Sequence, residues 1–244
     1  MSGNRNEQKI LGRGVYGASE ALRLVNFSIN TGDAVTQVSR QTVARWLRGY
    51  DFTVHGENHH SSPLWVPDYA NDDDTIELSF RDLIELRFIK AFRDAGVGLQ
   101  TVRQCFERAV DLVKDDRPFS TQRFRTDGRT IFLEITEGTS DGALVDLRQR
   151  QAVFRSFVAP SFKDLEFDAD VVARWFPLGG SRRSVMVDPV FAFGRPISAV
   201  GYVPTEVLAL AAKVEGSVER AARLYEVPAS IVREALAFEG KLAA

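Results

Sequence analysis

The chain has a single cysteine among its 244 residues, Cys105, and no run of 18 consecutive apolar residues. One cysteine excludes an intrachain disulfide framework and a cysteine-rich zinc site. Cys105 falls on the apolar side of an expected helix, so we predict a buried, unreactive thiol. A membrane-spanning helix is excluded, and the polar first residues lack the apolar stretch of a signal peptide. We therefore expect a soluble, cytoplasmic protein.

Histidine is also scarce, because the chain has only His55, His59 and His60, all within one expected loop. Neither a Ser–His–Asp triad nor a paired-carboxylate site can be argued around them. The loop lacks the cysteines or ordered carboxylates of a metal site, so we expect no metal. We predict that the protein is not an enzyme and has no catalytic residues.

The glycine-rich start has the one pattern that is typical of cofactor binding. Gly12, Gly14 and Gly17 match the spacing of the dinucleotide fingerprint. No strand pattern precedes them and no ribose-binding acid follows at the usual distance, which disfavours a Rossmann site. We therefore expect no cofactor. A small-molecule-binding or enzymatic protein that uses this segment stays open as an alternative.

The formal net charge is only −2, which argues against a non-specific nucleic-acid binder. The charge is unevenly distributed, however. Residues 1–50 contain seven Lys or Arg and three Asp or Glu, whereas residues 51–78 contain no Lys or Arg and seven acids. The first stretch therefore suits a phosphate backbone, and the second does not.

The hydrophobic pattern predicts an α+β fold with two domains, residues 1–117 and 118–244. Apolar side chains recur at helical spacing through the first domain, and Ser79-Phe80-Arg81-Asp82 has the pattern of a capping box. Pro118 prevents the last of these helices from continuing, so we place the boundary there.

The second domain is predicted to be mixed, with a β-hairpin or small sheet followed by helices. The turn dipeptide Asp127-Gly128 and the alternation of Ile131, Leu133 and Ile135 predict the hairpin. Further short strands are expected at 144–147, at 152–154 and around Val185 and Val187. Three short helices are expected to close the chain, over residues 204–214, 217–225 and 228–239.

The segment from Val38 to Arg48 has the strongest functional pattern. Val38, Val43 and Trp46 have the spacing of the apolar positions in the second half of a helix-turn-helix, and Ser39 stands where an N-cap belongs. The polar side chains left on the outer face are Arg40, Gln41, Thr42, Arg45 and Arg48. Arg and Gln near the start of such a helix contact base edges in the major groove. The alternative is an amphipathic surface helix with a solvated basic face.

Four stretches within the first 110 residues resemble MerR-type winged helix-turn-helix domains. They are Tyr16-x-Ala18-Ser19-Glu20-Ala21, Val38-Ser39-Arg40-Gln41-Thr42-Val43, Arg81-Asp82-Leu83 followed by Leu86-Arg87-Phe88-Ile89-Lys90, and Gly96-Val97-Gly98-Leu99-Gln100-Thr101-Val102-Arg103. The resemblance implies DNA binding. Val38 comes twelve residues later than an ordinary turn would place it, and Pro118 stands where MerR regulators continue into a long dimerisation helix. A metal- or drug-sensing role is therefore not carried over.

The C-terminal region repeats the same apolar intervals at Val227, Val232 and Ala235. Its outer face, however, offers only Arg233 beside Glu234. We therefore predict a helix-turn-helix-like module that serves packing or protein contact, in preference to a second DNA reader.

Residues 186–240 resemble a small helical domain of VapB-type antitoxins, most clearly in Phe193-Gly194-Arg195-Pro196 and in the closing helix Ala235-Leu236-Ala237-Phe238-Glu239. Together with the N-terminal unit, the resemblance covers nearly the whole chain. It implies an antitoxin of a type II toxin–antitoxin pair, which neutralises a PIN-domain ribonuclease of the VapC kind and represses its own operon. The alternative is a stand-alone MerR-like regulator without a toxin.

These implied functions name two partners, double-stranded operator DNA and the toxin, and a homodimer that matches a palindromic operator. PIN nucleases gather carboxylates around Mg²⁺, so an intruding cation could compete with the metal. Arg182 and Arg183 lie in a Gly-flanked loop and are the candidate toxin-binding residues. A solvated loop is the alternative.

Overall fold

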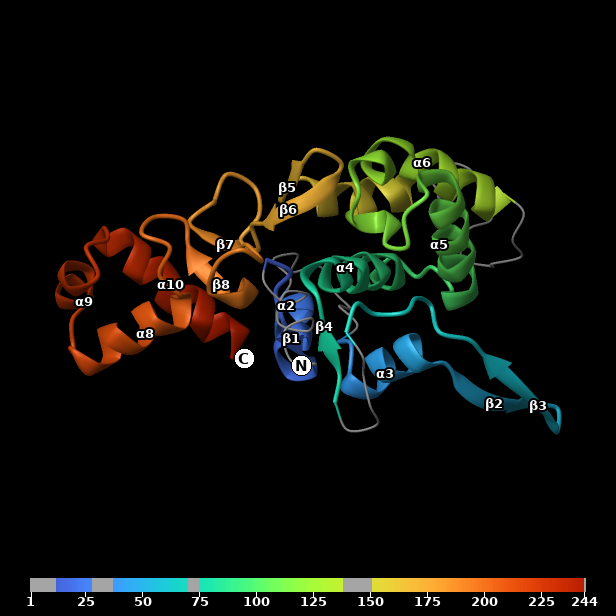
Figure 1. Ribbon diagram of the computed structural model, residues 1–244, viewed down its shortest axis with the longest axis horizontal. Helices are drawn as coiled ribbons and strands as arrows, with labels where there is room; N and C mark the ends of the chain where they lie inside the picture. Colours follow the sequence, from blue (N-terminus) through green and yellow to red (C-terminus); the bar gives the residue numbers. More distant parts are fainter. Residues whose placement is uncertain (1–11, 28–36, 70–74, 138–150, 244) are drawn as a thin grey trace, which may run out of the picture.

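The computed structural model describes residues 12–27, 37–69, 75–137 and 151–243, which form an α+β fold (Figure 1). The first part of the chain contains β1 (Tyr16–Gly17), α2 (Ala18–Asn26), α3 (Arg40–Arg48), β2 (Tyr50–Val54), β3 (Glu57–Ser61), β4 (Glu77–Leu78), α4 (Phe80–Asp94) and α5 (Leu99–Val113). None of the helices in the described ranges is both long enough and apolar enough to cross a membrane.

The later part of the chain begins with short helical turns and ends in three helices. Its elements are η1 (Pro118–Ser120), α6 (Gln122–Glu137), η2 (Phe154–Val158), η3 (Ala159–Phe162), β5 (Leu165–Asp168), β6 (Val171–Trp175), β7 (Val185–Val187), η4 (Ala192–Gly194), β8 (Pro196–Ser198), α8 (Thr205–Val214), α9 (Val218–Leu224) and α10 (Ala229–Leu242). Strands β5 to β8 form one antiparallel sheet in sequence order, whereas β1–β4 and β2–β3 form two separate two-stranded sheets.

The predicted capping box at the start of α4 is confirmed. The Ser79 side chain accepts a hydrogen bond from the backbone N–H of Asp82, and the Asp82 carboxylate accepts one from the backbone N–H of Ser79. This reciprocal pair satisfies two donors that a helix start otherwise leaves open. The same carboxylate also accepts from the indole of Trp65 and the guanidinium of Arg117, so it connects the start of α4 to the two segments that contain these residues.

The predicted β-hairpin around Asp127-Gly128 is wrong, because the structure has the continuous helix α6 there. The buried side of α6 is formed by Phe124, Gly128, Ile131, Phe132 and Thr136, which recur every three to four residues. Thr121 begins the helix, since its hydroxyl oxygen accepts a hydrogen bond from the backbone N–H of Phe124. A glycine fits inside this helix because a Cβ on Gly128 would lie 2.9 Å from the Phe124 ring.

The predicted strand at 152–154 is also wrong. Residues 151–153 are helical and continue into the π-helical turn η2, in which Phe154 and Val158 are buried four residues apart. A strand of this length would instead have placed alternate side chains on the core. The predicted strand at 144–147 lies outside the described residues. The strand expected around Val185 and Val187 is confirmed as β7, and its three residues are all buried.

An aromatic core runs across the predicted domain boundary at residue 117. Phe119, just after the boundary, lies 5.9 Å from Phe88 and 5.3 Å from Phe106, measured between ring centroids. Phe132 of α6 stacks on Phe92 of α4 at 5.6 Å. Residues from both predicted domains thus belong to one hydrophobic cluster, and Cys105 is buried in it as predicted. Burial raises the pKa of the Cys105 thiol to about 12, so the thiol is unreactive.

The three predicted C-terminal helices are confirmed as α8, α9 and α10, and they have a core of their own. That core consists of Leu208, Ala211, Ala212, Ala221, Ala222, Val227, Ile231, Val232 and Ala235. We call these three helices the C-terminal helical unit. It occupies one end of the molecule, with the β2–β3 hairpin at the other end (Figure 1).

Candidate nucleic-acid interface

Helix α3 has the two faces that its sequence predicts. The Ser39 hydroxyl caps it by accepting a hydrogen bond from the backbone N–H of Thr42 at 3.2 Å. Val43, Trp46 and Leu47 are 1%, 6% and 5% exposed and hold the inner face against the rest of the fold. The cap and the apolar face therefore fix the orientation of the outer face.

The five predicted DNA-binding residues all lie on α3, but the structure treats them differently. Arg40, Gln41 and Arg45 are exposed, whereas Thr42 and Arg48 are half-buried. Thr42 is within 3.0 Å of the capping hydroxyl, and Arg48 donates a hydrogen bond to the backbone oxygen of Thr75. The side chains best placed to contact a ligand in solution are therefore Arg40, Gln41 and Arg45.

One side chain, that of Asn26, connects the end of α2 to the residue Val38, which stands twelve positions later in the sequence. The Asn26 amide donates to the backbone oxygen of Val38 and accepts from the backbone N–H of Val38, both at 2.9 Å. Asn26 is the last residue of α2, and it occupies the position where an uninterrupted turn would have its apolar residue. Val38 is nevertheless buried, at 6% exposure, directly before α3. The Asn26 side chain thus holds the end of α2 beside the start of α3.

An antiparallel β-hairpin, Tyr50–Ser61, follows α3 directly. The sequence predicts a loop with a short strand over residues 50–78, because the segment is rich in Gly, His, Asp, Asn and Pro. The strand Glu57–Ser61 gives no apolar signal. Phe52 stacks on His59 across the hairpin with ring centroids 5.5 Å apart, and His60 bonds Asp51 at 2.7 Å. The order helix, helix, hairpin is that of a winged helix-turn-helix. This hairpin has no Lys or Arg, so at neutral pH it brings no fixed positive charge to a phosphate backbone.

Two residues outside α3 position the hairpin, and sequence reasoning gave neither of them a role. The Arg103 guanidinium, on α5, donates hydrogen bonds to the backbone oxygens of Pro63 and Ser62 at 2.9 and 2.6 Å. Gly49 has a φ of +77°, and a Cβ there would lie 2.4 Å from the backbone oxygen of Ser61. The glycine therefore permits the sharp exit from α3, and the arginine fixes the base of the returning strand.

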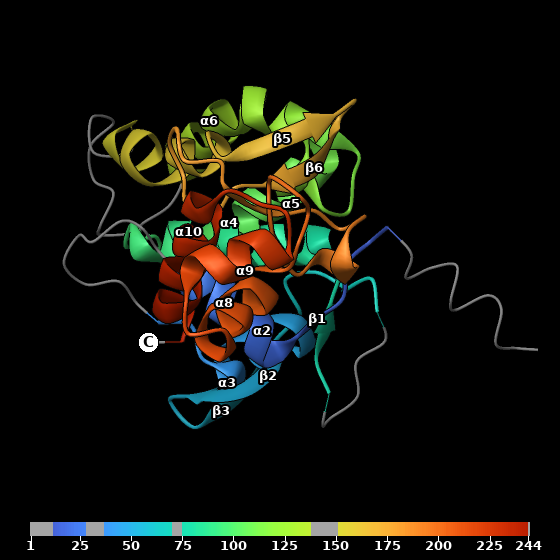
Figure 2. The ribbon, with the colours of Figure 1, turned by 90° about the vertical axis from the view of Figure 1, so that its left-hand side faces the viewer.

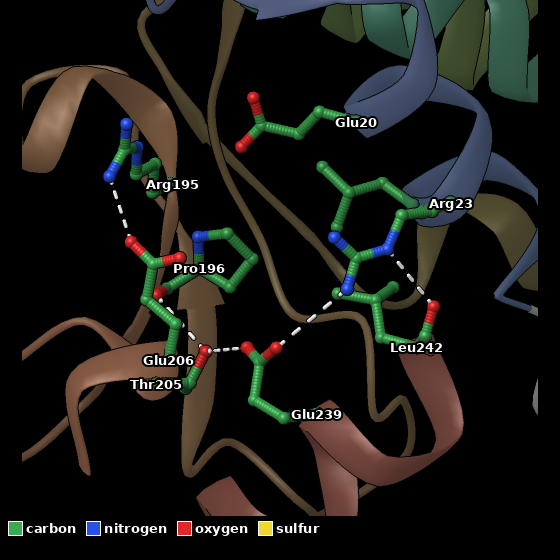
Figure 3. A pocket seen from close by; sticks show the side chains of 9 residues that line it. Glu20, Arg23, Arg195, Pro196, Thr205, Glu206, Glu239 and Leu242 are labelled. Atoms are coloured by element: carbon green, nitrogen blue, oxygen red, sulfur yellow. Dashed lines mark hydrogen bonds and ion pairs between the residues drawn. The ribbon is translucent and has the colours of Figure 1, made fainter. Parts of the chain in front are cut away.

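The C-terminal helical unit contacts the outer side of α2. Arg23 of α2 donates to the backbone oxygen of Leu242 at 3.1 Å, and its guanidinium lies 3.9 Å from the Glu239 carboxylate. Figure 3 shows these groups around a pocket that Glu20 of α2 also lines, across from Glu239. Burial raises the pKa of the Glu20 carboxyl. The helix that supports α3 is thus tied to the C-terminal end of the chain.

The predicted Phe193-Gly194-Arg195-Pro196 motif contributes to the same contact. The backbone oxygen of Gly194 accepts from the buried Tyr16 hydroxyl at 2.8 Å, and that of Phe193 accepts from the backbone N–H of Val15 at 3.0 Å. A Cβ on Gly194 would lie 2.2 Å from the Tyr16 hydroxyl. The glycine is therefore required for this close approach between β1 and η4.

The two predicted toxin-binding arginines, Arg182 and Arg183, lie between β6 and β7, away from α3 (Figure 1). Arg182 is exposed. Arg183 is ion-paired with Glu166, and its guanidinium lies 4.6 Å from the centroid of the Phe176 ring. Only Arg182 therefore extends from the surface without such a partner among the described residues.

Comparison with known proteins supports the fold class. No protein-family model and no curated protein matches the chain. A solved structure, that of Rv2018 from Mycobacterium tuberculosis, is similar to it, with a TM-score of 0.65 and 19% sequence identity. The similarity covers 91% of this chain and 96% of that chain. At this identity the likeness concerns the fold alone, and the chain is an α+β protein whose N-terminal part has the element order of a winged helix-turn-helix.

Proposed function

We propose that this protein is a sequence-specific DNA-binding regulator that inserts α3 into the major groove. The observation that carries the proposal is the outer face of α3, where Arg40, Gln41 and Arg45 are exposed on a helix whose other face is packed. Arginine and glutamine are the side chains that bond guanine and adenine edges. The function requires binding and no catalysis.

The charge of the β2–β3 hairpin limits which residues can attract the phosphate backbone of DNA. Because the hairpin has Asp51 and Glu57 but no Lys or Arg, its fixed charges repel phosphates. The arginines of α3 must then supply most of the electrostatic affinity. With the two exposed arginines of α3, Arg40 and Arg45, in each copy of a dimer, about four phosphate contacts give the log–log dependence of the binding constant on salt a slope on the order of −4.

Selection from random duplex DNA tests the proposal. The wild-type protein should enrich one motif, and Arg45→Ala should weaken binding to that motif about tenfold or more, since a good base contact contributes about 1–3 kcal/mol. Arg223→Ala, at an exposed arginine of α9, is the matched control and should leave affinity unchanged. If selection enriches no motif, or if both variants bind like the wild type, the proposal is wrong.

A second candidate function is the antitoxin role that the resemblance of the tail implies, with a PIN-domain ribonuclease as partner. One observation favours a protein partner at this end of the chain. Val190, Phe191, Phe193, Val200 and Tyr202 are between 38% and 71% exposed, and the rings of Phe191 and Tyr202 lie 4.8 Å apart. Large apolar side chains exposed together are typical of a protein-contact surface.

The antitoxin candidate is tested by co-expression with the product of the neighbouring reading frame. A stable complex that suppresses a Mg²⁺-dependent ribonuclease supports it, and Arg182→Glu should then release part of that activity. Arg220→Glu, on α9, is the control for the change of charge. DNA binding without any such complex would favour the stand-alone regulator.

A further inference from the structure

Helix α8 has an apolar stripe on the side that faces away from its own core. Its buried residues include Leu208, Ala211 and Ala212, which pack against α9 and α10. On the outer side, Leu210 is 62% and Val214 is 74% exposed, four residues apart. Val207, one turn before Leu210, is half-buried on the same side. Spacings of three and four residues place these side chains in one row along the helix.

Two opposite charges flank this row along one edge. Glu206 and Lys213 are both exposed and are seven residues apart, which is two helical turns. Glu206 pairs with Arg195 at 2.8 Å, but both side chains are more than half exposed, so the pair leaves room for a second cation. Lys213 makes no ion pair with any of the described residues. We call the set Glu206, Val207, Leu210, Lys213 and Val214 the α8 stripe.

We propose that the α8 stripe binds the α8 stripe of a second copy of this chain, in antiparallel orientation. The midpoint of Glu206 and Lys213 and the midpoint of Val207 and Val214 both fall next to Leu210. A two-fold axis through Leu210, perpendicular to the helix, therefore places each Glu206 beside the partner's Lys213. It also places each Val207 against the partner's Val214, with the two leucines in contact at the centre.

The alternative, parallel arrangement does not fit the same residues. A two-fold axis along the helix would bring the charged edge of one copy against the valine edge of the other and set Glu206 level with Glu206. An isologous interface must be self-complementary, and only the antiparallel pairing makes this one so. Figure 2, which views the molecule from the side of the C-terminal helical unit, shows α8 and α9 toward the viewer.

The proposed interface would form the dimer that binding to a palindromic operator requires. The interface itself does not depend on DNA binding. Because α8 has ten residues and spans about 15 Å, the contact is small, and the dimer should dissociate on dilution. Sedimentation velocity of the full chain without DNA, over a range of concentrations, measures this directly. We expect a monomer–dimer equilibrium for the wild-type protein.

Two leucines of equal exposure provide a matched pair of variants. Leu210 and Leu224 are both 62% exposed, but only Leu210 belongs to the α8 stripe. Leu210→Asp should give a monomer at every concentration, and Leu224→Asp should dimerise like the wild type. A wild-type chain that stays monomeric, a Leu210→Asp dimer, or loss of the dimer in Leu224→Asp would each overturn the proposal.

A mixing experiment tests the antiparallel register itself. Glu206→Lys leaves two lysines on each stripe and Lys213→Glu leaves two glutamates, so each variant alone should be a monomer. An equal mixture should form a heterodimer, because both charge pairs are then opposite. If the mixture contains only monomers, this register is wrong. Loss of DNA binding with the dimer intact would contradict the proposed function and leave this interface standing.

Discussion

The helix pairs α2–α3 and α9–α10 bury the same apolar intervals and expose different chemistry. The buried positions are Val38, Val43 and Trp46 in the first pair and Val227, Val232 and Ala235 in the second. On α3 the outer face has arginines and no acid. On α10, Arg233 lies 3.3 Å from the Glu219 carboxylate and Glu234 bonds the Ser184 side chain. Similar burial sets how the second helix packs, and the remaining side chains decide what it can bind.

The far ends of the two helices differ in the same way. Helix α3 leads through Gly49 into an exposed hairpin. The end of α10 instead packs on α2, where the ring of Phe238 lies 4.8 Å from that of Phe27. The outer face of α3 is therefore exposed to solvent, whereas α10 packs against the rest of the molecule.

The largest expected effect is a pH dependence in the core that holds the α2–α3 pair, which is distinct from the core of the C-terminal helical unit. Burial raises the pKa of the Glu85 carboxyl on α4 to about 8, although the backbone N–H groups of Phe119 and Ser120 lower it. The folded state therefore binds a proton that the unfolded state has released between about pH 4.5 and 8. The free energy of unfolding should fall by a few kcal/mol as pH rises through this window.

Tryptophan fluorescence measures this effect in the right region, because all three tryptophans, Trp46, Trp65 and Trp175, belong to the same core cluster as the aromatic residues around Glu85. Denaturant titrations at several pH values should show a steep pH dependence in the wild type and a shallow one in Glu85→Gln. Parallel curves for the two proteins would show that Glu85 does not titrate in this range.

The next prediction compares two variants that shorten the corresponding buried valine in each helix pair. Val43 and Val232 are 1% and 0% exposed, so Val43→Ala and Val232→Ala should each lower the free energy of unfolding by on the order of 2 kcal/mol. Only Val43→Ala should also weaken binding to the selected DNA, because it removes packing that holds α3 in its orientation. Equal losses of DNA affinity in both variants, under conditions where both are folded, would remove the distinction between the pairs.

The smallest expected effect concerns the helix caps. Ser39 caps α3 and Ser217 caps α9, each by accepting a backbone N–H. Ser39→Ala and Ser217→Ala should each cost about 1 kcal/mol of stability. Hydrogen exchange should show faster opening at the start of α3 in the first variant and of α9 in the second. Faster exchange throughout the chain in either variant would mean that the two regions open together.

The elements that could be predicted are those with local signals. Ser39 and Ser79 mark helix starts, and the C-terminal helices have regular apolar spacing and their own small core. The sequence does not predict helix α6, because Ile131, Leu133 and Ile135 also fit the two-residue period of a strand. In addition, the dipeptide Asp127-Gly128 is typical of a turn. The identity of α6 as a helix depends on contacts with Phe88 and Phe92, which lie 36 and 40 residues before their partners Phe124 and Phe132.

The candidate site shows the same division. The residues of α3 could be named because one short segment contains both the apolar face and the arginines. The parts that hold α3 and the hairpin in place, Asn26 and Arg103, bond to the backbone of Val38 and of residues 62–63, which are 12 and about 40 residues away. A backbone acceptor leaves no trace in side-chain identity, so such partners cannot be found from one sequence.

The Asn26–Val38 bond has a consequence for how this chain can change. One amide holds Val38 beside the end of α2, so two described residues fix where the intervening stretch begins and ends. The entropy of closing a loop grows only with the logarithm of its length. This position is therefore a permissive insertion point, where an epitope or a reporter peptide could be grafted while Asn26 and Val38 are kept.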